Sequence, residues 1–396
     1  MSIRLSTSIR ERSAIETLKL AKKMAHRVGI TRVTEVTRLD RVGVPIFVSI
    51  RPNSQSLCVN SGKSLLPLEA EVGAYMEAIE FFYAEQFNSF AISDINVGDL
   101  THELGEFCLL DGIDSTAVKS VRCVQFDDPS SPCPTWLPAE LAFHPFRDGE
   151  RPRLYGTSTN GLASGNSIEE ATAHALFELL ERDCFSFYQI FDDSRNVSEF
   201  SLPKYIRSII NAARKEGLET IIKFVPNEFN LPFFVTLIHE RSKITPLYTS
   251  VGCGLHMDRN IALARSVTEA FQSRLAYIHG GRDDIVQRFK SHETRTIDER
   301  ISIAERQYKI SIERQWIDFG TIPTHEGSKS GKSVMDDVTS VLKKAGFNHV
   351  YRLVLTPKST DLVVVRVVVP YLENYSQDLP RIGPRLTNYY LSSYGK

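Results

Sequence analysis

The sequence predicts a mixed fold of the α/β or α+β class, and three observations support this. Stretches with apolar residues at helical spacing alternate with short runs rich in β-branched residues. Glycine-containing turns separate many of these stretches. Hydrophobic residues make up 42% of the 396 residues, which is enough to bury one large core or two smaller ones. No low-complexity region or linker divides the chain, so we expect residues 1–396 to form a single unit.

The first half of the chain begins with a predicted helix. Apolar residues recur at helical spacing through Arg10–Val28, and Gly29 ends the pattern. The next stretch, Thr31–Arg51, has the pattern of a strand, a turn and a strand. A second helix is predicted at Leu68–Phe87. Proline, serine and charged residues are frequent in Asp127–Arg153, which predicts a long connection or lid.

The second half adds more helices and strands. A helix is predicted at Ser167–Tyr188, with Ser167 as its N-cap and Glu170 three residues later in a capping-box pattern. The remaining predicted elements are a strand at Pro232–Leu237, a helix at Asn260–His279, a helix at Val334–Ala345 and a buried strand at Leu362–Val369.

Charge and hydropathy exclude several classes of function. Lysine and arginine number 47 against 48 acidic residues, so the net charge of −1 gives no general attraction to nucleic acid or to an anionic membrane. The N-terminus lacks the apolar core of a signal peptide. The longest apolar run, Leu362–Pro370, is interrupted by Arg366 and is far shorter than the roughly 20 residues that span a bilayer. We therefore expect a cytoplasmic protein. The six cysteines form no Cys-x-x-Cys pair, so their spacing resembles neither a zinc site nor a disulfide framework.

Three predicted helices carry acid or amide side chains at positions i and i+3, on one helix face. The pairs are Glu77 with Glu80, Glu178 with Glu181, and Glu269 with Gln272. The first two pairs lie among apolar residues, where like charges repel and burial increases the cost. A divalent cation relieves both costs, and Mg²⁺ commonly binds one or two carboxylates together with phosphate oxygens. A single Glu-x-x-Glu pair is more often a solvated helix face, which is the alternative interpretation.

Two glycine-containing motifs have features of phosphate sites. The motif Ser61-Gly-Lys-Ser64 is not a P-loop, because Leu57 stands where that motif requires a glycine. The segment Asn160–Asn166 precedes a predicted helix and could present amide groups to an anion, although such a segment is more often an ordinary turn.

In their order along the chain, these segments resemble the YcaO family, and the resemblance covers about Gly29 to Arg385. The blocks that carry it are Gly29–Pro45, Arg51-Pro52, Ser61-Gly-Lys63, the Glu77/Glu80 helix, Asn160-Gly-Leu-Ala-Ser-Gly-Asn166, Glu169-Glu-Ala171, Glu178-Leu-Leu-Glu-Arg-Asp183, Gly252-Cys-Gly-Leu-His256, Arg265–Arg274, Gly281-Arg-Asp-Asp284, Val369-Pro-Tyr-Leu-Glu373 and Gly383-Pro-Arg385.

The resemblance implies a YcaO-type ATP-binding fold without a P-loop, in which acidic helices hold Mg²⁺ against the phosphates of ATP. Residues 1–28 would contribute a helix to the nucleotide site. By position, the metal ligands would be Glu77, Glu80, Glu178 and Glu181, and the catalytic residues Glu77, Glu178 and Arg182. The remaining nucleotide-site residues would be Arg10, Thr17, Gly73, Asn166, Glu170, Arg182, Arg265 and Arg274. The chain departs from the family at Gly73, where a serine is common, and at Ser64, where a glycine is common.

The reaction that the resemblance implies is ATP-dependent activation of a backbone amide in a peptide or protein substrate. The product would be a thioamide if a sulfide source attacks, or an azoline if a substrate Cys, Ser or Thr side chain attacks. The chain lacks the Pro-x-Pro-x-Pro ending of many azoline-forming members, which favours thioamidation with a TfuA-type partner. The alternatives are an azoline-forming cyclodehydratase with a separate leader-binding partner, a non-catalytic nucleotide-binding accessory module, and a carboxylate–amine ligase. Family members are often dimers, so the resemblance also implies that this chain could form a homodimer.

Overall fold

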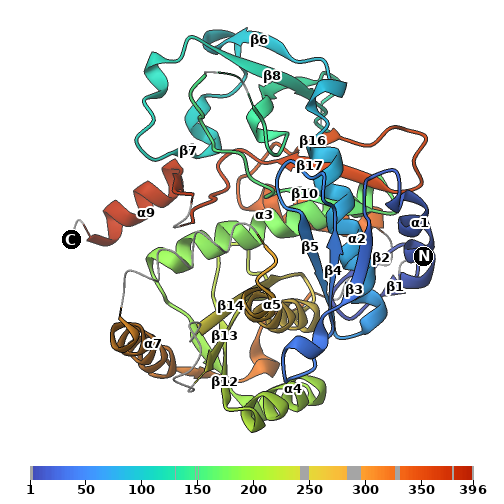
Figure 1. Ribbon diagram of the computed structural model, residues 1–396. Coiled ribbons are helices and arrows are strands. Elements are labelled where there is room, and N and C mark those ends of the chain that lie inside the picture. Colours follow the sequence, from blue (N-terminus) through green and yellow to red (C-terminus); the bar gives the residue numbers. More distant parts are fainter. Residues whose placement is uncertain are drawn as a thin grey trace.

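The computed structural model describes residues 3–129, 131–147, 149, 151–240, 249–282, 296–325, 331–376 and 379–394. It confirms the mixed α/β fold: helices and small sheets are packed around the long helix α3, which crosses the middle of the molecule in Figure 1. Asp283 and Asp284, which belong to one of the motif blocks, lie outside the described residues.

The helices of the described residues follow the sequence prediction in the stretches that it covered. They are α1 (Ala14–Ala25), α2 (Pro67–Ala84), α3 (Ile168–Ile190), α4 (Lys204–Lys215), α5 (Arg259–His279), α7 (Ile297–Ile312), α8 (Gly331–Lys344) and α9 (Pro384–Tyr394). No helix among these ranges is both long enough and apolar enough to cross a membrane.

The strands form several small sheets. They are β1 (Ile3–Arg4), β2 (Ile9–Arg10), β3 (Arg32–Glu35), β4 (Ile46–Ile50), β5 (Val59–Lys63), β6 (Ser93–Asn96), β7 (Leu109–Leu110), β8 (Ser120–Phe126), β9 (Thr135–Pro138), β10 (Leu162–Gly165), β11 (Arg195–Val197), β12 (Leu218–Phe224), β13 (Phe233–Glu240), β14 (Thr249–Leu255), β15 (Trp316–Ile317), β16 (Tyr351–Val354), β17 (Val363–Val368) and β18 (Arg381–Ile382). Their orders are β1-β2, β3-β4-β5, β6-β8-β9, β7-β18, β10-β17-β16 and β14-β13-β12-β11-β15.

Three apolar cores hold these sheets and helices together. One lies where α2 meets the β6-β8-β9 sheet and includes Ile79 and Phe143. A second joins α3 and α8 to β13 and β17, around Leu180 and Phe233. The third lies under α4 and α5 and includes Phe271. Because α2, α3 and α5 each cover a different sheet, their remaining faces are free to turn toward one another.

The stretch Asp127–Arg153 differs from the predicted connection or lid. It contains β9, which pairs with β8, and its side chains Leu137 and Phe143 are buried in the first core. The frequent proline and charged residues of this stretch favoured the prediction of a connection, although the stretch contains a short buried strand. The preceding residues, for which no strand was predicted, form β6 and β8 at the top of Figure 1.

One helix start and one predicted capping box differ from the prediction. The first helix begins at Ala14 rather than near Arg10, because Ser13 caps it in a capping box with Glu16. Ser167 caps α3 as predicted, accepting a hydrogen bond from the Glu170 backbone. The Glu170 carboxylate does not complete a capping box, since it is engaged by residues of the candidate site described below.

Candidate functional site

The helices α2, α3 and α5 and the N-terminal segment enclose a cavity of about 420 Å³. Most of the residues predicted from the sequence line it. These are Arg10, Thr17, Gly73, Glu77, Glu80, Asn166, Glu170, Glu178, Glu181, Arg182 and Arg265. The cavity also has lining residues that the site prediction did not include, among them Lys63, Glu69, His174, Glu269 and Gln272.

Helical spacing explains why each helix contributes several side chains. Glu69, Gly73, Glu77 and Glu80 follow one another at intervals of four, four and three residues along α2, and they line the cavity. Glu170, His174, Glu178 and Glu181 repeat these intervals on α3, and Arg265, Glu269 and Gln272 repeat the last two on α5. Residues at these intervals lie on one helix face. The three helices therefore present the same pattern to a shared space.

Two glycines allow α2 to approach β5 closely. A Cβ atom at Gly62 would lie 2.1 Å from the backbone oxygen of Ala70, and a Cβ atom at Gly73 would lie 3.2 Å from the Gly62 Cα. The close approach brings the Ser61 amide to the Glu77 carboxylate, to which it donates a hydrogen bond. Gly73 thus lines the cavity and also sets the distance between strand and helix, which accounts for the absence of a side chain there.

The carboxylate of Glu80 is held by β10. It accepts hydrogen bonds from the backbone amide of Ser164 at 2.8 Å and from its hydroxyl at 2.5 Å. Burial, together with the nearby carboxylates of Glu77 and Glu178, raises the pKa of Glu80 to about 8, although the Ser164 hydrogen bonds oppose the shift. The side chain is fixed in position but is costly to ionise in the protein alone.

Glu178 is the least satisfied carboxylate of the cavity. Within the part of the chain that the structure describes, its carboxylate makes neither a hydrogen bond nor an ion pair. Burial raises the pKa of Glu178 to about 7, with Glu181 adding to the shift and Arg182 opposing it. A carboxylate in this position requires either a proton or a cation as its partner.

Charged groups on the α3–α5 side of the cavity form a connected network. Glu181 is buried; its Oε2 accepts a hydrogen bond from the Leu255 amide at 3.1 Å and lies 3.5 Å from the Arg265 guanidinium. The Arg182 guanidinium lies 3.4 Å from Glu181 Oε1 and 3.7 Å from Glu269 Oε1. These two arginines are therefore held in place at the cavity wall, where they can face an anion.

Lys63 and Glu269 are site residues that the sequence analysis did not assign to the nucleotide site. Lys63 Nζ lies 2.9 Å from Glu269 Oε2. Burial disfavours the charged form of Glu269, but Lys63 and Arg182 outweigh it and lower the pKa of Glu269 to about 2. The signal for both was present in the sequence, in the Glu269-x-x-Gln272 pattern and in the Ser61-Gly-Lys63 block.

The N-terminal segment closes one side of the cavity. Arg10 Nη1 donates to the Glu170 carboxylate at 3.1 Å and to the Ser164 carbonyl at 3.2 Å. Asn166 Nδ2 donates to Glu170 at 3.0 Å, and the Thr17 hydroxyl donates to Asn166 Oδ1 at 3.0 Å. The structure thus brings Arg10 and Thr17 to the site, as the sequence analysis expected.

Arg274 lies outside the cavity, and the prediction of a phosphate contact is corrected. Its guanidinium is buried, with Nε 3.2 Å from Asp40 and Nη1 2.5 Å from Glu240. Arg274 follows Arg265 by nine residues, which at about 100° per residue places it on the opposite face of α5. Two carboxylates already neutralise this arginine, and its position fits a structural role.

The donor set of the cavity fits a magnesium ion that binds with phosphate. Seven carboxylates and five basic side chains line the cavity. Among the described residues, no three histidine, cysteine or acidic side chains lie close enough together to bind a metal ion by themselves. Mg²⁺ usually binds one or two carboxylates and completes its octahedral shell with water and phosphate oxygens. The basic side chains supply the countercharge that phosphates need.

Comparisons of sequence place the chain among known proteins. The model of the YcaO cyclodehydratase family, described as ATP- and Mg²⁺-binding, matches residues 61–373. An uncharacterized protein of Methanothermobacter thermautotrophicus is 30% identical over 379 residues, which cover 94% of this chain and 97% of its own. An uncharacterized protein in the tfuA 3′ region of Rhizobium leguminosarum bv. trifolii is 28% identical over 385 residues, covering 91% of this chain and 88% of its own.

Solved structures share the fold. A YcaO protein from Methanopyrus kandleri bound with AMPPCP and Mg²⁺ has a TM-score of 0.77 and 20% identity, covering 96% of this chain and 98% of its own. A heterocyclase in complex with substrate and cofactor has a TM-score of 0.79 and 17% identity, covering 99% of this chain and 57% of its own. At these identities the likeness concerns the fold.

Proposed function

The chain belongs to the YcaO family of ATP- and Mg²⁺-dependent cyclodehydratase-type enzymes, and we propose that its carboxylate-lined cavity serves the activation of a backbone amide in a peptide or protein substrate. The observation that carries this proposal is the raised pKa of Glu178 and of Glu80 in one cavity. Two carboxylates with raised pKa values face one cavity, opposite fixed arginines. Perturbed acids in a cleft are typical of functional sites.

We assign Glu77, Glu80, Glu178 and Glu181 to Mg²⁺. They project from α2 and α3 into one cavity, and carboxylate oxygens are ligands that a hard cation prefers. Burial, and to a smaller extent the neighbouring carboxylates, raise the pKa of Glu80, and a bound cation would offset both effects. When bound, Mg·ATP supplies the phosphoryl group that turns the poor leaving oxygen of an amide into a good one.

The basic residues of the cavity have a separate task. Arg182, Arg265 and Lys63 each lie close to a carboxylate, which holds their cationic groups at the wall. Cations fixed in this way stabilise charge that spreads over a transferring phosphoryl group, without reorganisation during the reaction. Arg10, Thr17, Asn166 and Glu170 form a hydrogen-bonded cluster that closes the site on the N-terminal side. We assign this cluster to nucleotide binding.

For the product, we infer a thioamide, formed with a TfuA-type partner protein. The support is the relative whose gene lies in the tfuA 3′ region, which matches over 91% of this chain. An external sulfide donor would then attack the activated amide carbon. The alternative, attack by a Cys, Ser or Thr side chain of the substrate to give an azoline, needs no sulfide donor and would act with a separate leader-binding partner.

The two products differ in mass, which gives a direct test. The purified chain is incubated with a candidate substrate peptide, Mg·ATP and sulfide, with and without a TfuA-type protein, and the peptide is analysed by mass spectrometry. A thioamide shows the mass gain of an oxygen-to-sulfur exchange and requires sulfide. Loss of one water without a sulfide requirement would contradict thioamidation and support the azoline alternative. The Glu178→Gln variant should form neither product.

A further inference from the structure

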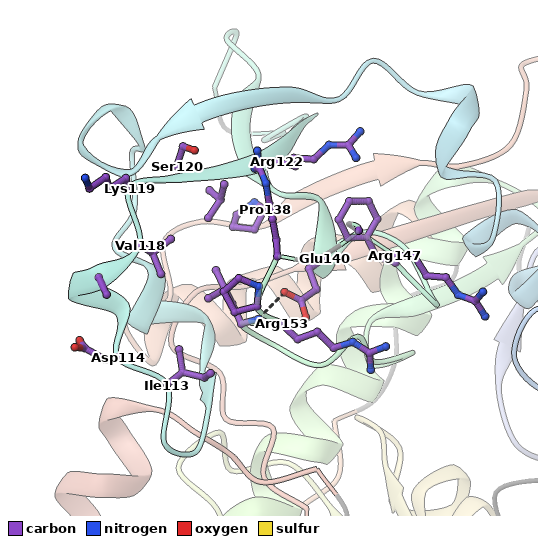
Figure 2. A pocket seen from close by; sticks show the side chains of 17 residues that line it. Ile113, Asp114, Val118, Lys119, Ser120, Arg122, Pro138, Glu140, Arg147 and Arg153 are labelled. Carbon is purple, nitrogen blue, oxygen red and sulfur yellow. Dashed lines mark hydrogen bonds between the residues drawn. The ribbon is translucent and has the colours of Figure 1, made fainter.

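A second cavity, of about 830 Å³, lies apart from the candidate site, between β8, the end of β9 and the described residues 146–147, 149 and 151–154 (Figure 2). We call it the basic cleft. A volume of this size is typical of ligand sites in proteins. The basic side chains that line it are Lys119, Arg122, Arg147, Arg151 and Arg153, and the acidic ones are Asp114 and Glu140.

Among the described residues, the charged side chains of the basic cleft differ in whether they have partners. The Glu140 carboxylate accepts hydrogen bonds from the backbone amides of Leu154 at 2.9 Å and Gly156 at 2.7 Å, so it holds the chain beside the cleft. Arg147 and Arg153 are exposed and, among the residues that the structure describes, make no hydrogen bond or ion pair. In the view of Figure 2 these two arginines lie at one end of the cleft. They are therefore available to an anionic ligand.

One wall of the basic cleft is the edge of a strand. On one side of β8, strand β6 pairs with all of Ser120–Cys123. On the other side, β9 pairs with β8 only from Cys123, opposite Pro138, to Phe126. No described strand covers Ser120–Arg122 on that second side, because the chain turns away after Pro138. Such an edge can accept an extended peptide as an added strand.

We propose that the basic cleft binds an extended acidic segment of the substrate, which adds as a strand along Ser120–Arg122 and pairs its carboxylates with Arg147 and Arg153. The inference rests on the proposed function, since it takes the substrate to be a peptide or protein. The two features of the cleft act together: the strand edge recognises backbone in any sequence, and the arginines select for acidic side chains.

The basic cleft is within reach of the candidate site. Leu154 lines the cleft, and Thr159 lines the cavity of the candidate site. Thr159 follows Leu154 by five positions, so their Cα atoms lie at most about 18 Å apart. An extended substrate that places its acidic segment several residues from the reacting amide can therefore occupy both cavities. The cleft would hold the substrate, and the carboxylate cavity would act on it.

The test measures peptide binding to the full chain by fluorescence anisotropy. The probe is a labelled peptide of about ten residues with alternating Glu and Thr, which favours an extended conformation. The variant Arg147→Ala/Arg153→Ala removes both arginines. The matched control, Lys204→Ala/Arg207→Ala, removes the same charge from exposed positions of α4 that line neither cavity. A second probe carries N-methyl groups at alternate amides, which blocks strand addition.

We expect the Arg147→Ala/Arg153→Ala variant to bind the probe about tenfold more weakly, because two partly solvated charge contacts together contribute on this order. The control variant should bind like the wild type, the N-methylated probe should bind more weakly, and added salt should weaken binding. Equal binding by both double variants would overturn the proposal. An oligonucleotide of equal charge that binds the same arginines more tightly than the peptide would also overturn it. Mg·ATP binding, measured by calorimetry on the same samples, reports on the candidate site independently of the cleft.

Discussion

Replacing Glu80 with glutamine should stabilise the protein in the absence of Mg²⁺ and ATP while weakening their binding. Glutamine keeps an oxygen that can accept the two hydrogen bonds from Ser164, but it carries no charge. The pKa of Glu80 is raised by burial from 4.5 to about 8. The folded state therefore favours the protonated carboxyl, and stability that is fully present below pH 4.5 is lost as the pH rises through 8.

The magnitude follows from the size of the shift. Each pKa unit corresponds to about 1.4 kcal/mol, so the shift of Glu80 sets an upper limit of about 4 kcal/mol at pH 8. Water reaches the cavity, so we expect the Glu80→Gln variant to gain on the order of 2 kcal/mol in free energy of unfolding at that pH. For a chain of this length, this corresponds to a rise in Tm of about 2–3 °C. At pH 4.5 the two proteins should differ little.

Thermal unfolding across this pH range, with and without Mg·ATP, measures both effects. The control is Glu71→Gln, on the same helix but paired with Lys22 at 2.9 Å near the surface, where a lost ion pair changes stability by less than about 1 kcal/mol. Addition of Mg·ATP should raise the Tm of the wild type and of the control more than that of Glu80→Gln. A Glu80→Gln variant that is no more stable than wild type at pH 8, or equally shifted at pH 4.5, would refute the reasoning.

Three further predictions concern the site and its support. Mg·ATP affinity should rise between about pH 6 and pH 8, because Glu178, with a pKa of about 7, must lose its proton to bind a cation; a pH-independent calorimetric affinity would argue against this role. Glu85→Ala should reduce the free energy of unfolding by about 3–5 kcal/mol in urea titrations, because it leaves the buried guanidinium of Arg51 without a carboxylate; a loss under 1 kcal/mol would contradict this. Gly62→Ala should lower both Tm and Mg·ATP affinity, because the new Cβ would clash with the α2 backbone. The control Gly98→Ala should change neither, because nothing lies within 4 Å of its new Cβ.

The acidic face of each helix could be predicted from the sequence because it depends on local spacing. Glu77 with Glu80 and Glu178 with Glu181 follow helical periodicity within apolar stretches, and the structure places both pairs on one cavity. The same rule could have separated Arg265 from Arg274, which point to opposite faces of α5, and could have added Glu269 to the site. At Arg274 the motif resemblance predicts a nucleotide contact, whereas helical periodicity does not.

Other parts of the structure depend on contacts between distant segments. Strand β9 is only four residues long, and it is defined by pairing with β8 rather than by its own pattern. The salt bridge between Lys63 and Glu269 joins residues more than two hundred positions apart. The basic cleft likewise forms only when β8 meets residues 146–147 and 151–154. Sequence periodicity carries no information on which distant elements will meet.

Calorimetric titration of ATP into the wild type and the Glu178→Gln variant, each with and without Mg²⁺, tests the central claim most directly. We predict that wild type binds ATP only when Mg²⁺ is present, and that Glu178→Gln weakens this binding by more than about tenfold, since it removes the carboxylate that lacks a partner within the described protein. Glu71→Gln should bind like the wild type. Folded wild type that does not bind ATP with Mg²⁺, or a Glu178→Gln variant with unchanged affinity, would contradict the assignment of this cavity to Mg·ATP.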